Sequence, residues 1–257
     1  MKLLIKISYL GTDYCGYQVQ PNGITVQEKL NEATRLLFGF DCDIVGCSRT
    51  DSGVHAKEFC ATVCRRGTDG LETAIPTERI VPALNQYLPA DIRVFDAGWV
   101  PESFHARYSV VAKEYVYRIC LRRVMDPFEI GRAAHLPGRF TDSDLQKMQE
   151  AAGQFCGTHD FSAYMAQGSK ITDPVRTVFL SRIEREGDLL LYRVRANGFL
   201  YHMVRILTGT LVEVAQGKIQ PSEIPAITES RDRSRAGLTM PACGLYLNRV
   251  FYTDPEI

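Results

Sequence analysis

The sequence predicts a mixed α+β fold made of two halves. Segments in which apolar and polar residues alternate, typical of strands, are interspersed with segments whose apolar residues recur every three or four positions, typical of helices. The chain has 257 residues, 45% of them hydrophobic, which is enough for one large core or two smaller joined cores. We therefore expect an N-terminal half over residues 1–104 and a C-terminal half over residues 105–257.

The N-terminal half is predicted to contain four strands and two helices. Thr25 is a suitable N-cap for the first helix, because Glu28 follows three residues later and completes a capping box. Val26, Leu30, Ala33 and Leu37 then continue an apolar stripe at helical spacing. The expected strands span residues 2–9, 43–47, 58–64 and 91–99, and the second helix spans 76–88.

The C-terminal half is predicted to open with a long strand over residues 109–121. Thr141 can cap a helix that runs from about 142 to 154. Two alternating segments flank Glu186-Gly187-Asp188 and predict a β-hairpin. Further elements are expected as a buried helix over 199–215 ended by Gly217, a short helix beginning at Pro221, and a closing strand over 245–252.

Composition excludes several classes of protein. No stretch approaches the 18 to 20 or so apolar residues of a membrane span, so no membrane association is expected. The eight cysteines are scattered and include no Cys-x-x-Cys pair, which argues against a zinc framework and favours free thiols in a reducing cytoplasm. Basic and acidic residues number 30 each, so a basic nucleic-acid surface, if present, is confined to one region.

The segment from Gly46 to Ala56 carries the strongest chemical signal. Arg49 precedes Asp51 by two residues, small turn-forming residues surround both, and apolar runs flank the segment. A neighbouring cation on a confined loop favours the ionised carboxylate, as catalysis by Asp51 requires. The alternative is ordinary turn chemistry, because Asp-Ser-Gly is a common turn sequence.

Three histidines, His55, His105 and His202, raise the alternative of a metal site. Each stands beside small or apolar neighbours, where histidines are more often packed and hydrogen-bonded than metal-bound, and we expect no metal. Candidate phosphate contacts are more numerous and are not ranked by the sequence: Arg65, Arg66, Arg107, Lys113 and Lys170.

Seven motifs in order resemble the tRNA pseudouridine synthase A family over essentially the whole chain. The first two are the loop from Tyr14 to Gln20, continuing into Thr25-Val26-Gln27, and the Arg49–Ala56 segment. The others are Phe104–Ser109 leading into Lys113-x-Tyr115-x-Tyr117, Gly157–Phe161, Arg176-Thr177, Phe199-x-x-His202-Met203-Val204-Arg205, and Cys243–Leu247.

The resemblance implies the pseudouridine synthase fold, in which the antiparallel sheets of two α/β-sandwich-like halves join around a central cleft. It implies isomerisation of uridine to pseudouridine within tRNA, at positions 38–40 of the anticodon arm. This chemistry uses no cofactor and no metal. The resemblance also implies a cytoplasmic homodimer with one tRNA spanning both subunits.

The resemblance assigns roles residue by residue. Asp51 matches the catalytic carboxylate and Arg205 the arginine that pairs with it; the alternative for Arg205 is a cation on a helix surface. Tyr115 matches the tyrosine that stacks on the extruded uracil, whereas on spacing alone Tyr115 and Tyr117 are ordinary strand aromatics. Arg49 is expected to fill the gap left by the flipped base or to contact phosphates; the alternative is an ion pair with Asp51.

Two segments depart from the family pattern. Tyr17 stands where tryptophan is common, and Cys47-Ser48 replaces the small-Gly pair often found before the arginine. These departures leave open a paralogue with altered tRNA preference. A non-catalytic RNA-binding protein of the same fold is a separate alternative, which the intact Arg49-Thr50-Asp51 context disfavours. An aspartic protease is disfavoured, because the chain has only one Asp-Ser/Thr-Gly and that chemistry needs two carboxylates.

Overall fold

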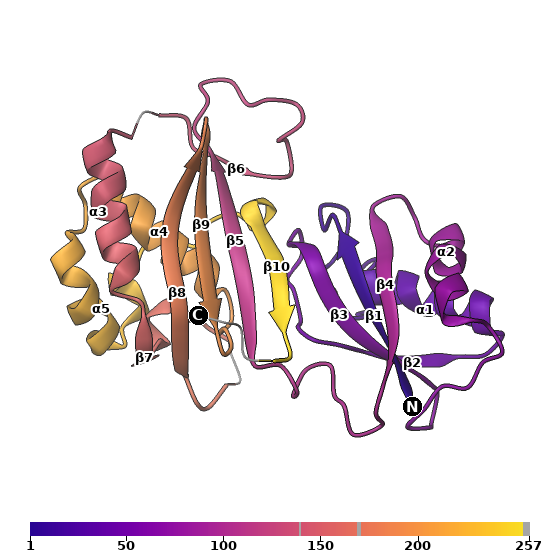
Figure 1. Ribbon diagram of the computed structural model, residues 1–257. Coiled ribbons are helices and arrows are strands. Elements are labelled where there is room, and N and C mark those ends of the chain that lie inside the picture. Colours follow the sequence, from indigo (N-terminus) through magenta and orange to yellow (C-terminus); the bar gives the residue numbers. More distant parts are fainter. Residues whose placement is uncertain (139, 169–170, 254–257) are drawn as a thin grey trace. The chain divides into compact units, whose positions relative to one another are not determined.

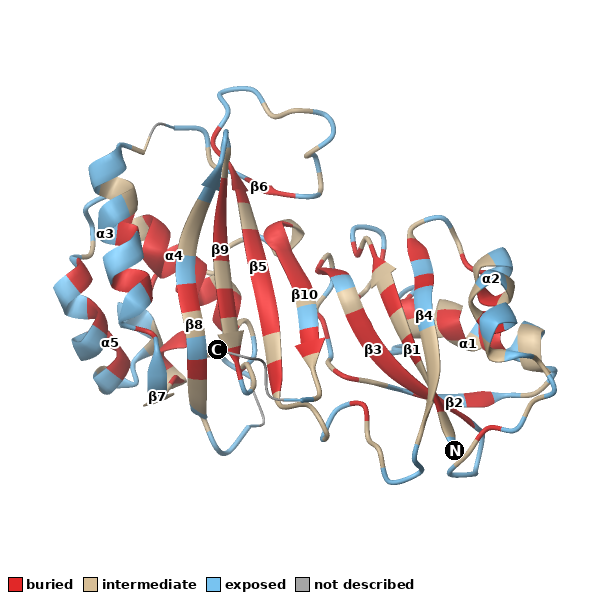
Figure 2. Cartoon of the chain, in the orientation of Figure 1, coloured by how far each residue is buried: buried red, intermediate tan, exposed pale blue. Residues whose placement is uncertain are grey.

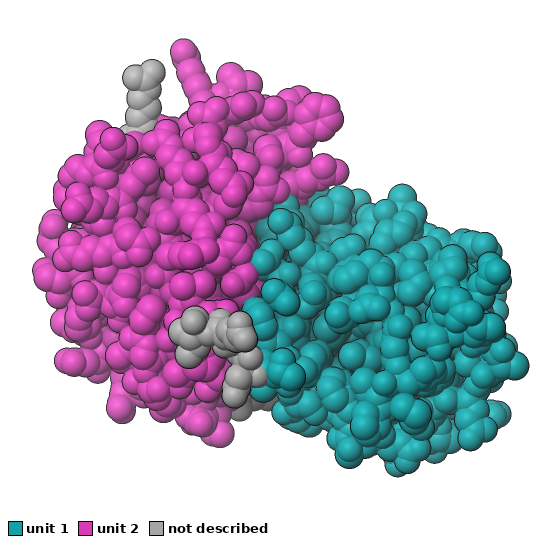
Figure 3. All heavy atoms as spheres, viewed as in Figure 1, with its two compact units in different colours: residues 1–111, 246–257 teal, residues 112–245 magenta. Residues whose placement is uncertain are grey.

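A computed structural model describes residues 1–138, 140–168 and 171–253 and divides the chain into two compact units (Figures 1 and 3). The first unit comprises Met1–Val111 and Tyr246–Ile257, and the second comprises Ala112–Leu245. The halves expected at 1–104 and 105–257 differ from these units in the boundary, which follows Val111, and in topology. The C-terminal strand belongs to the first unit, so the second unit is inserted into it.

The first unit is a sheet with two helices. Its strands are β1 (Lys2–Tyr9), β2 (Cys42–Gly46), β3 (His55–Arg65), β4 (Ile92–Val100) and the end of β10 (Leu245–Phe251). They lie in the order β4-β1-β3-β10, with β2 also paired to β3. The pairs among β1, β2, β3 and β4 are antiparallel, whereas β10 runs parallel to β3.

Alternation and capping explain the elements of this unit. Along β1 every second residue is buried, with Leu3, Ile5, Ile7 and Tyr9 facing the core. Helix α1 (Val26–Phe38) begins at the predicted capping box of Thr25 and Glu28 and ends at Gly39 with φ 77°. Helix α2 (Thr77–Tyr87) lies within the range expected for it and packs against α1 and β4.

The second unit contains an antiparallel sheet in the order β5-β9-β8-β7. These strands span Ala112–Cys120 (β5), Gly157–Asp160 (β7), Val175–Glu186 (β8) and Leu189–Ala196 (β9), and the short β6 (Ala134–His135) runs parallel to β5. The predicted hairpin is confirmed: Gly187 and Asp188 connect β8 to β9, with φ 60° at Gly187. Figure 2 shows β5 almost entirely buried.

The described part of this unit also contains three α-helices: α3 (Asp142–Gly153), α4 (Met203–Ala215) and α5 (Ile224–Ser230). Thr141 caps α3 as predicted, with Asp144 completing the capping box. Every residue of α4 is buried except Arg205 and Glu213. The helix begins four residues later than the apolar run suggested, because His202 adopts a left-handed conformation (φ 58°).

A close backbone approach holds α4 in the second unit. The segment from Gly237 to Met240 lies along this helix: the Gly237 amide donates to Thr210 Oγ1 and the Leu238 amide to Glu213 Oε1. A Cβ on Gly209 would stand 1.8 Å from the carbonyl oxygen of Leu238. Only glycine permits this contact.

Replacing a glycine inside a helix by alanine usually raises stability, but Gly209→Ala should lower it. Alanine normally stabilises a helix interior by about 0.5–1 kcal/mol relative to glycine, and Gly153→Ala, with nothing within 4 Å of its Cβ, should be neutral or stabilising. Gly209→Ala should instead destabilise by about 1–3 kcal/mol, because the new methyl group forces the Leu238 backbone away. Urea unfolding of both variants measures the difference; equal midpoints would contradict the close packing.

Candidate functional site

Asp51 opens a tight turn in the first unit. The Val54 amide donates to the Asp51 carbonyl oxygen at 3.1 Å, and Gly53 between them has φ 78°, as the third residue of a type II turn requires. Strand β3 begins immediately afterwards, at His55. The turn interpretation of Asp-Ser-Gly is thus correct, and the turn leaves the Asp51 residue half-buried.

The loop from Gly11 to Tyr17 packs directly on this turn. The Tyr17 amide donates to the Thr50 carbonyl at 3.1 Å, while the Gly53 amide and the Ser52 hydroxyl both donate to the Tyr14 carbonyl. A Cβ on Gly16, whose φ is 83°, would lie 2.6 Å from the Thr50 oxygen. The two motifs that looked separate in the sequence are therefore one structure.

Helix α1 and β1 fix the other sides of this structure. The amides of Val26 and Gln27, at the start of α1, donate to the carbonyls of Gly16 and Tyr17. On the β1 side, Tyr9 Oη and Thr50 Oγ1 share a buried hydrogen bond of 2.8 Å. The backbone on the N-terminal side of Asp51 is consequently held by a strand, a loop and, through that loop, a helix.

His55 is a packed residue, as expected for a histidine in apolar surroundings. It is fully buried, its Nδ1 accepts a hydrogen bond from the Gly11 amide at 2.9 Å, and its ring stacks on Tyr246 at 4.6 Å. His105 Nδ1 likewise accepts the amides of Arg107 and Tyr108. Within the described residues, no group of three or more His, Cys, Asp or Glu side chains is arranged to hold a metal ion.

Arg49 is exposed, one residue before the buried Thr50. Among the described residues its guanidinium makes no recorded hydrogen bond or ion pair, so the alternative of a simple ion pair with Asp51 is not realised. An exposed, uncompensated arginine beside a half-buried carboxylate leaves a positive charge available to an anionic ligand.

The side chain of Tyr17 carries an unusual polar atom. Its ring is buried and stacks on Phe59 at a centroid distance of 4.2 Å, and Gly46 lies against both rings. Its hydroxyl, however, has no hydrogen-bond partner. Burial raises the pKa of this phenol well above its ordinary value, so the group stays neutral.

Tyr115 and Tyr117 lie on β5 in the second unit, two residues apart on the same face. Tyr117 is fully buried and its hydroxyl donates to the Pro241 carbonyl at 2.6 Å, which is a structural role. Tyr115 meets the ring of Phe199 edge-on, with centroids 4.9 Å apart. The two tyrosines therefore differ in surroundings, although their spacing alone does not distinguish them.

Arg205 is one of the two residues of α4 that are not buried. Its Nε donates to the Met240 carbonyl at 2.6 Å, and its own carbonyl accepts the Met240 amide at 3.2 Å. Because Pro241 follows at once and accepts the Tyr117 hydroxyl, β5 and α4 are linked through this segment. The segment was not anticipated from the sequence, since nothing in residues 236–241 marks it as a partner of α4.

Other motif residues have clear structural roles. Gly244 lies against the Tyr117 ring, where a Cβ would approach to 2.6 Å. In the Gly157–Phe161 motif, Asp160 accepts hydrogen bonds from the Ser162 amide and hydroxyl and pairs with Arg231 at 2.9 Å.

Two cysteines of β3, Cys60 and Cys64, are buried. Burial raises the pKa of the Cys60 thiol to about 12, so this cysteine acts as an apolar residue.

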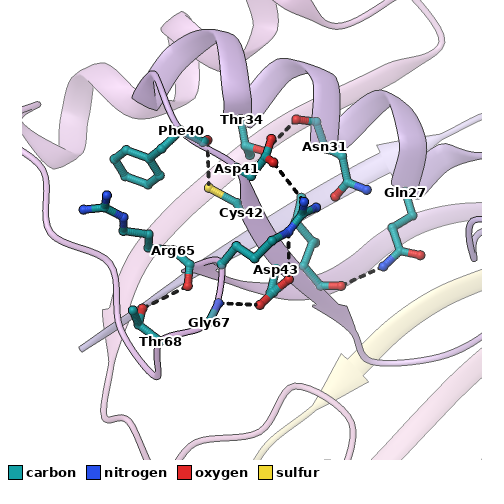
Figure 4. Close-up of polar contacts among 12 residues, drawn as sticks. Gln27, Asn31, Thr34, Phe40, Asp41, Cys42, Asp43, Arg65, Gly67 and Thr68 are labelled. Atoms are coloured by element: carbon teal, nitrogen blue, oxygen red, sulfur yellow. Dashed lines mark hydrogen bonds and ion pairs between the residues drawn. The ribbon is translucent and has the colours of Figure 1, made fainter.

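The candidate phosphate contacts fall into different classes. Figure 4 shows the rim of the first unit, where Asp41 and Asp43 pair with Arg66 at 2.8 and 3.6 Å and Arg65 lies over the Phe40 ring. The charge of Arg66 is thus already compensated. Arg107 remains exposed above Tyr108. Lys113 also makes an interaction within the protein, and Lys170 lies outside the described residues.

Known proteins resemble the chain along its length. A family model described as tRNA pseudouridine synthase matches residues 151–253. The tRNA pseudouridine synthase A of Bacillus pumilus (strain SAFR-032) is 46% identical over 99% of this chain and 100% of its own length. The chain belongs to the tRNA pseudouridine synthase A family.

Further members agree. The enzymes of that name from Thermoanaerobacter sp. (strain X514) and Staphylococcus saprophyticus are 42% and 38% identical, over 97% and 100% of this chain and 99% and 93% of their own lengths. Among solved structures, a Cbf5-Nop10-Gar1 complex is similar at 15% identity and a TM-score of 0.38, covering 95% of this chain and 48% of that one. That likeness is too distant to inform the site. No described helix is long and apolar enough to cross a membrane.

The unpartnered hydroxyl of Tyr17 gives a test of the packing in this family member. Tyr17→Phe removes a buried polar group that has no partner and should leave stability unchanged or raise it by about 1 kcal/mol. Tyr117→Phe removes a hydroxyl bonded to Pro241 and should cost about 1–2 kcal/mol. Thermal unfolding of the two variants measures both, and a larger loss for Tyr17→Phe would show that its hydroxyl is in fact satisfied.

Proposed function

We propose that this protein isomerises uridine to pseudouridine in tRNA, at positions 38–40 of the anticodon arm, with Asp51 as the catalytic carboxylate. The observation that carries the proposal is the turn at Asp51, held on its N-terminal side by β1, by the Gly11–Tyr17 loop and, through this loop, by α1. A carboxylate used for covalent or electrostatic catalysis must be fixed in place before the substrate arrives. Membership of the family supplies the reaction and the tRNA substrate.

The other residues take the roles that the family resemblance gives them. Tyr115 supplies the ring on which the extruded uracil stacks, an interaction that replaces lost stacking and is worth roughly 1–3 kcal/mol. Arg205 pairs with the catalytic aspartate and keeps it ionised. Arg49, exposed and uncompensated, contacts the RNA backbone or fills the space that the uracil leaves. The reaction uses no cofactor.

The protein acts in the cytoplasm as a homodimer, with one tRNA contacting both subunits. Exposed apolar side chains on the β5–β6 connector support a second copy as partner: Val124, Phe128 and Ile130 are 77%, 79% and 64% exposed. Large apolar side chains grouped on one exposed segment are typical of surfaces that become covered. A sedimentation mass equal to that of one chain would contradict the dimer.

Asp51→Asn should abolish isomerisation while tRNA binding is retained. The change removes only the charge, so turnover should fall by about 10⁴-fold or more, as for other essential catalytic groups. Asp13→Asn, the same change at an exposed position of the neighbouring loop, is the control and should stay active. Pseudouridine is mapped on unmodified tRNA transcripts by site-specific chemical modification and primer extension.

Measurable turnover by Asp51→Asn would exclude Asp51 as the catalytic group. If the wild-type protein bound tRNA but modified none, the alternative of a non-catalytic or retargeted RNA-binding paralogue would be favoured. Signal outside the anticodon arm would retain the reaction and change the target.

Gly16→Ala should impair activity through the position of the Asp51 turn. Alanine at φ 83° costs about 1–2 kcal/mol, and its Cβ would also displace the Thr50 carbonyl. Gly39→Ala carries the same conformational cost at φ 77° but meets nothing within 4 Å. At a temperature where both variants are folded, we expect turnover to fall about 10²-fold for Gly16→Ala and to change less than about twofold for Gly39→Ala. Equal turnover by the two variants would show that the position of the Gly11–Tyr17 loop does not affect the reaction.

A further inference from the structure

A cavity of about 660 Å³ lies at the turn end of the β8–β9 hairpin, within the second unit. Its described lining comes from three segments: Leu121, Arg122 and Arg123 after β5, Pro137, Gly138 and Phe140 after β6, and Arg185 and Asp188 at the end of the β8–β9 hairpin. Backbone hydrogen bonds join these segments, because the Leu121 amide donates to the Asp188 carbonyl at 2.9 Å and the Gly138 amide to the Leu121 carbonyl at 3.3 Å. The cavity is therefore built from connected backbone.

Positive charge predominates in this cavity. Arg122, Arg123 and Arg185 line it, against a single carboxylate, Asp188. The chain as a whole has a formal net charge of zero, so this local excess is not a consequence of composition. Guanidinium groups that are not already paired with carboxylates can together bind an anion with several oxygen acceptors.

The three arginines are not equally engaged. Arg122 is held by two carboxylates, Asp188 at 2.8 Å and Asp126 at 2.9 Å. Arg185 uses its Nε to donate to the Gly187 carbonyl at 3.1 Å, which leaves its terminal amino groups for other acceptors. Arg123 is exposed and has no recorded hydrogen bond or ion pair among the described residues.

Apolar surface adjoins this charge. The cavity is also lined by Leu121, which is buried, and by Phe140, which is half-buried. A nucleotide unit presents the same combination, with a phosphate that carries charge beside a base and sugar that can lie against an aromatic or aliphatic side chain.

We propose that this cavity binds a phosphodiester of the RNA substrate, with Arg123 and Arg185 on the phosphate oxygens and the adjoining nucleoside against Phe140. The inference rests on the proposed function for its substrate class. Leu121 directly follows β5 and lies six residues beyond Tyr115, which at the rise of a strand places it up to about 20 Å from that tyrosine. The bound phosphate thus belongs to a part of the tRNA away from the reacting uridine.

Arg123→Gln tests the site, because it removes one charge without leaving a carboxylate unpaired. The dissociation constant for full-length tRNA should rise about three- to tenfold, and the slope of log affinity against log salt concentration should fall by about one. Turnover at saturating tRNA should be unchanged while KM rises. Arg123→Lys keeps the charge and should restore most of the affinity.

Arg79→Gln is the matched control, since Arg79 is an exposed arginine on α2 of the first unit, does not line this cavity, and makes no side-chain hydrogen bond or ion pair among the described residues. It should change affinity less than about twofold. Sedimentation of each variant establishes that the oligomeric state is the same. If Arg123→Gln and Arg79→Gln gave the same affinity and slope, the cavity would not be an RNA subsite.

Phosphate ethylation interference identifies the partner in the RNA. Ethylation of one particular tRNA phosphate should weaken binding to the wild-type protein but not to Arg123→Gln. Inorganic phosphate provides the other arm: if it bound the cavity in a manner dependent on Arg123 while tRNA affinity did not depend on Arg123, the ligand would be a free anion and the RNA subsite would be excluded.

The two proposals fail separately. A wild-type protein that forms no pseudouridine, yet binds tRNA in a manner dependent on Arg123, would remove the proposed reaction and leave this site. A fully active protein whose tRNA affinity does not depend on Arg123 would keep the proposed reaction and exclude this site.

Discussion

The contact between the Gly11–Tyr17 loop and the Asp51 turn is the constraint on which the candidate site depends. Two stretches of backbone meet here without side chains between them: a Cβ on Gly11 would stand 2.0 Å from the Val54 oxygen, and one on Gly16 would stand 2.6 Å from the Thr50 oxygen. Direct backbone contact of this kind is stiff, because it has no rotamers to adjust. The carboxylate of Asp51 is therefore attached to a backbone that is held on several sides.

A comparable arrangement recurs in the second unit. Gly209 and Gly244 allow close approach to the Leu238 carbonyl and to the Tyr117 ring. Hydrogen bonds then join Tyr117 to Pro241 and Arg205 to Met240. In each unit, therefore, glycines allow an irregular segment to pack closely against the backbone or rings near the candidate site residues.

Local signals in the sequence predicted local structure well. The capping box at Thr25 and Glu28, the cap at Thr141 and the hairpin at Gly187 depend only on neighbouring residues, and the structure confirms all three. The start of α4 was wrong by four residues, because an apolar run does not reveal the positive φ of His202. Within the site, the turn at Asp51 was predictable from Asp-Ser-Gly. The two hydrogen bonds between Arg205 and Met240 were not predictable, since they join residues far apart in the sequence.

The parallel pairing of β10 with β3 has a consequence for how the chain is made. His55 reaches its stacking partner Tyr246 only after the whole inserted second unit has left the ribosome, at roughly 5–20 residues per second. Until then the nascent first unit lacks the β10 partner of His55 and Ala56 at the start of β3, and His55 beside the Asp51 turn is unstacked. The inserted unit, whose strands β5 to β9 are contiguous in sequence, has no such dependence. Synthesis therefore completes the strand pairing beside the Asp51 turn last, so that a truncated chain would lack this support of the turn.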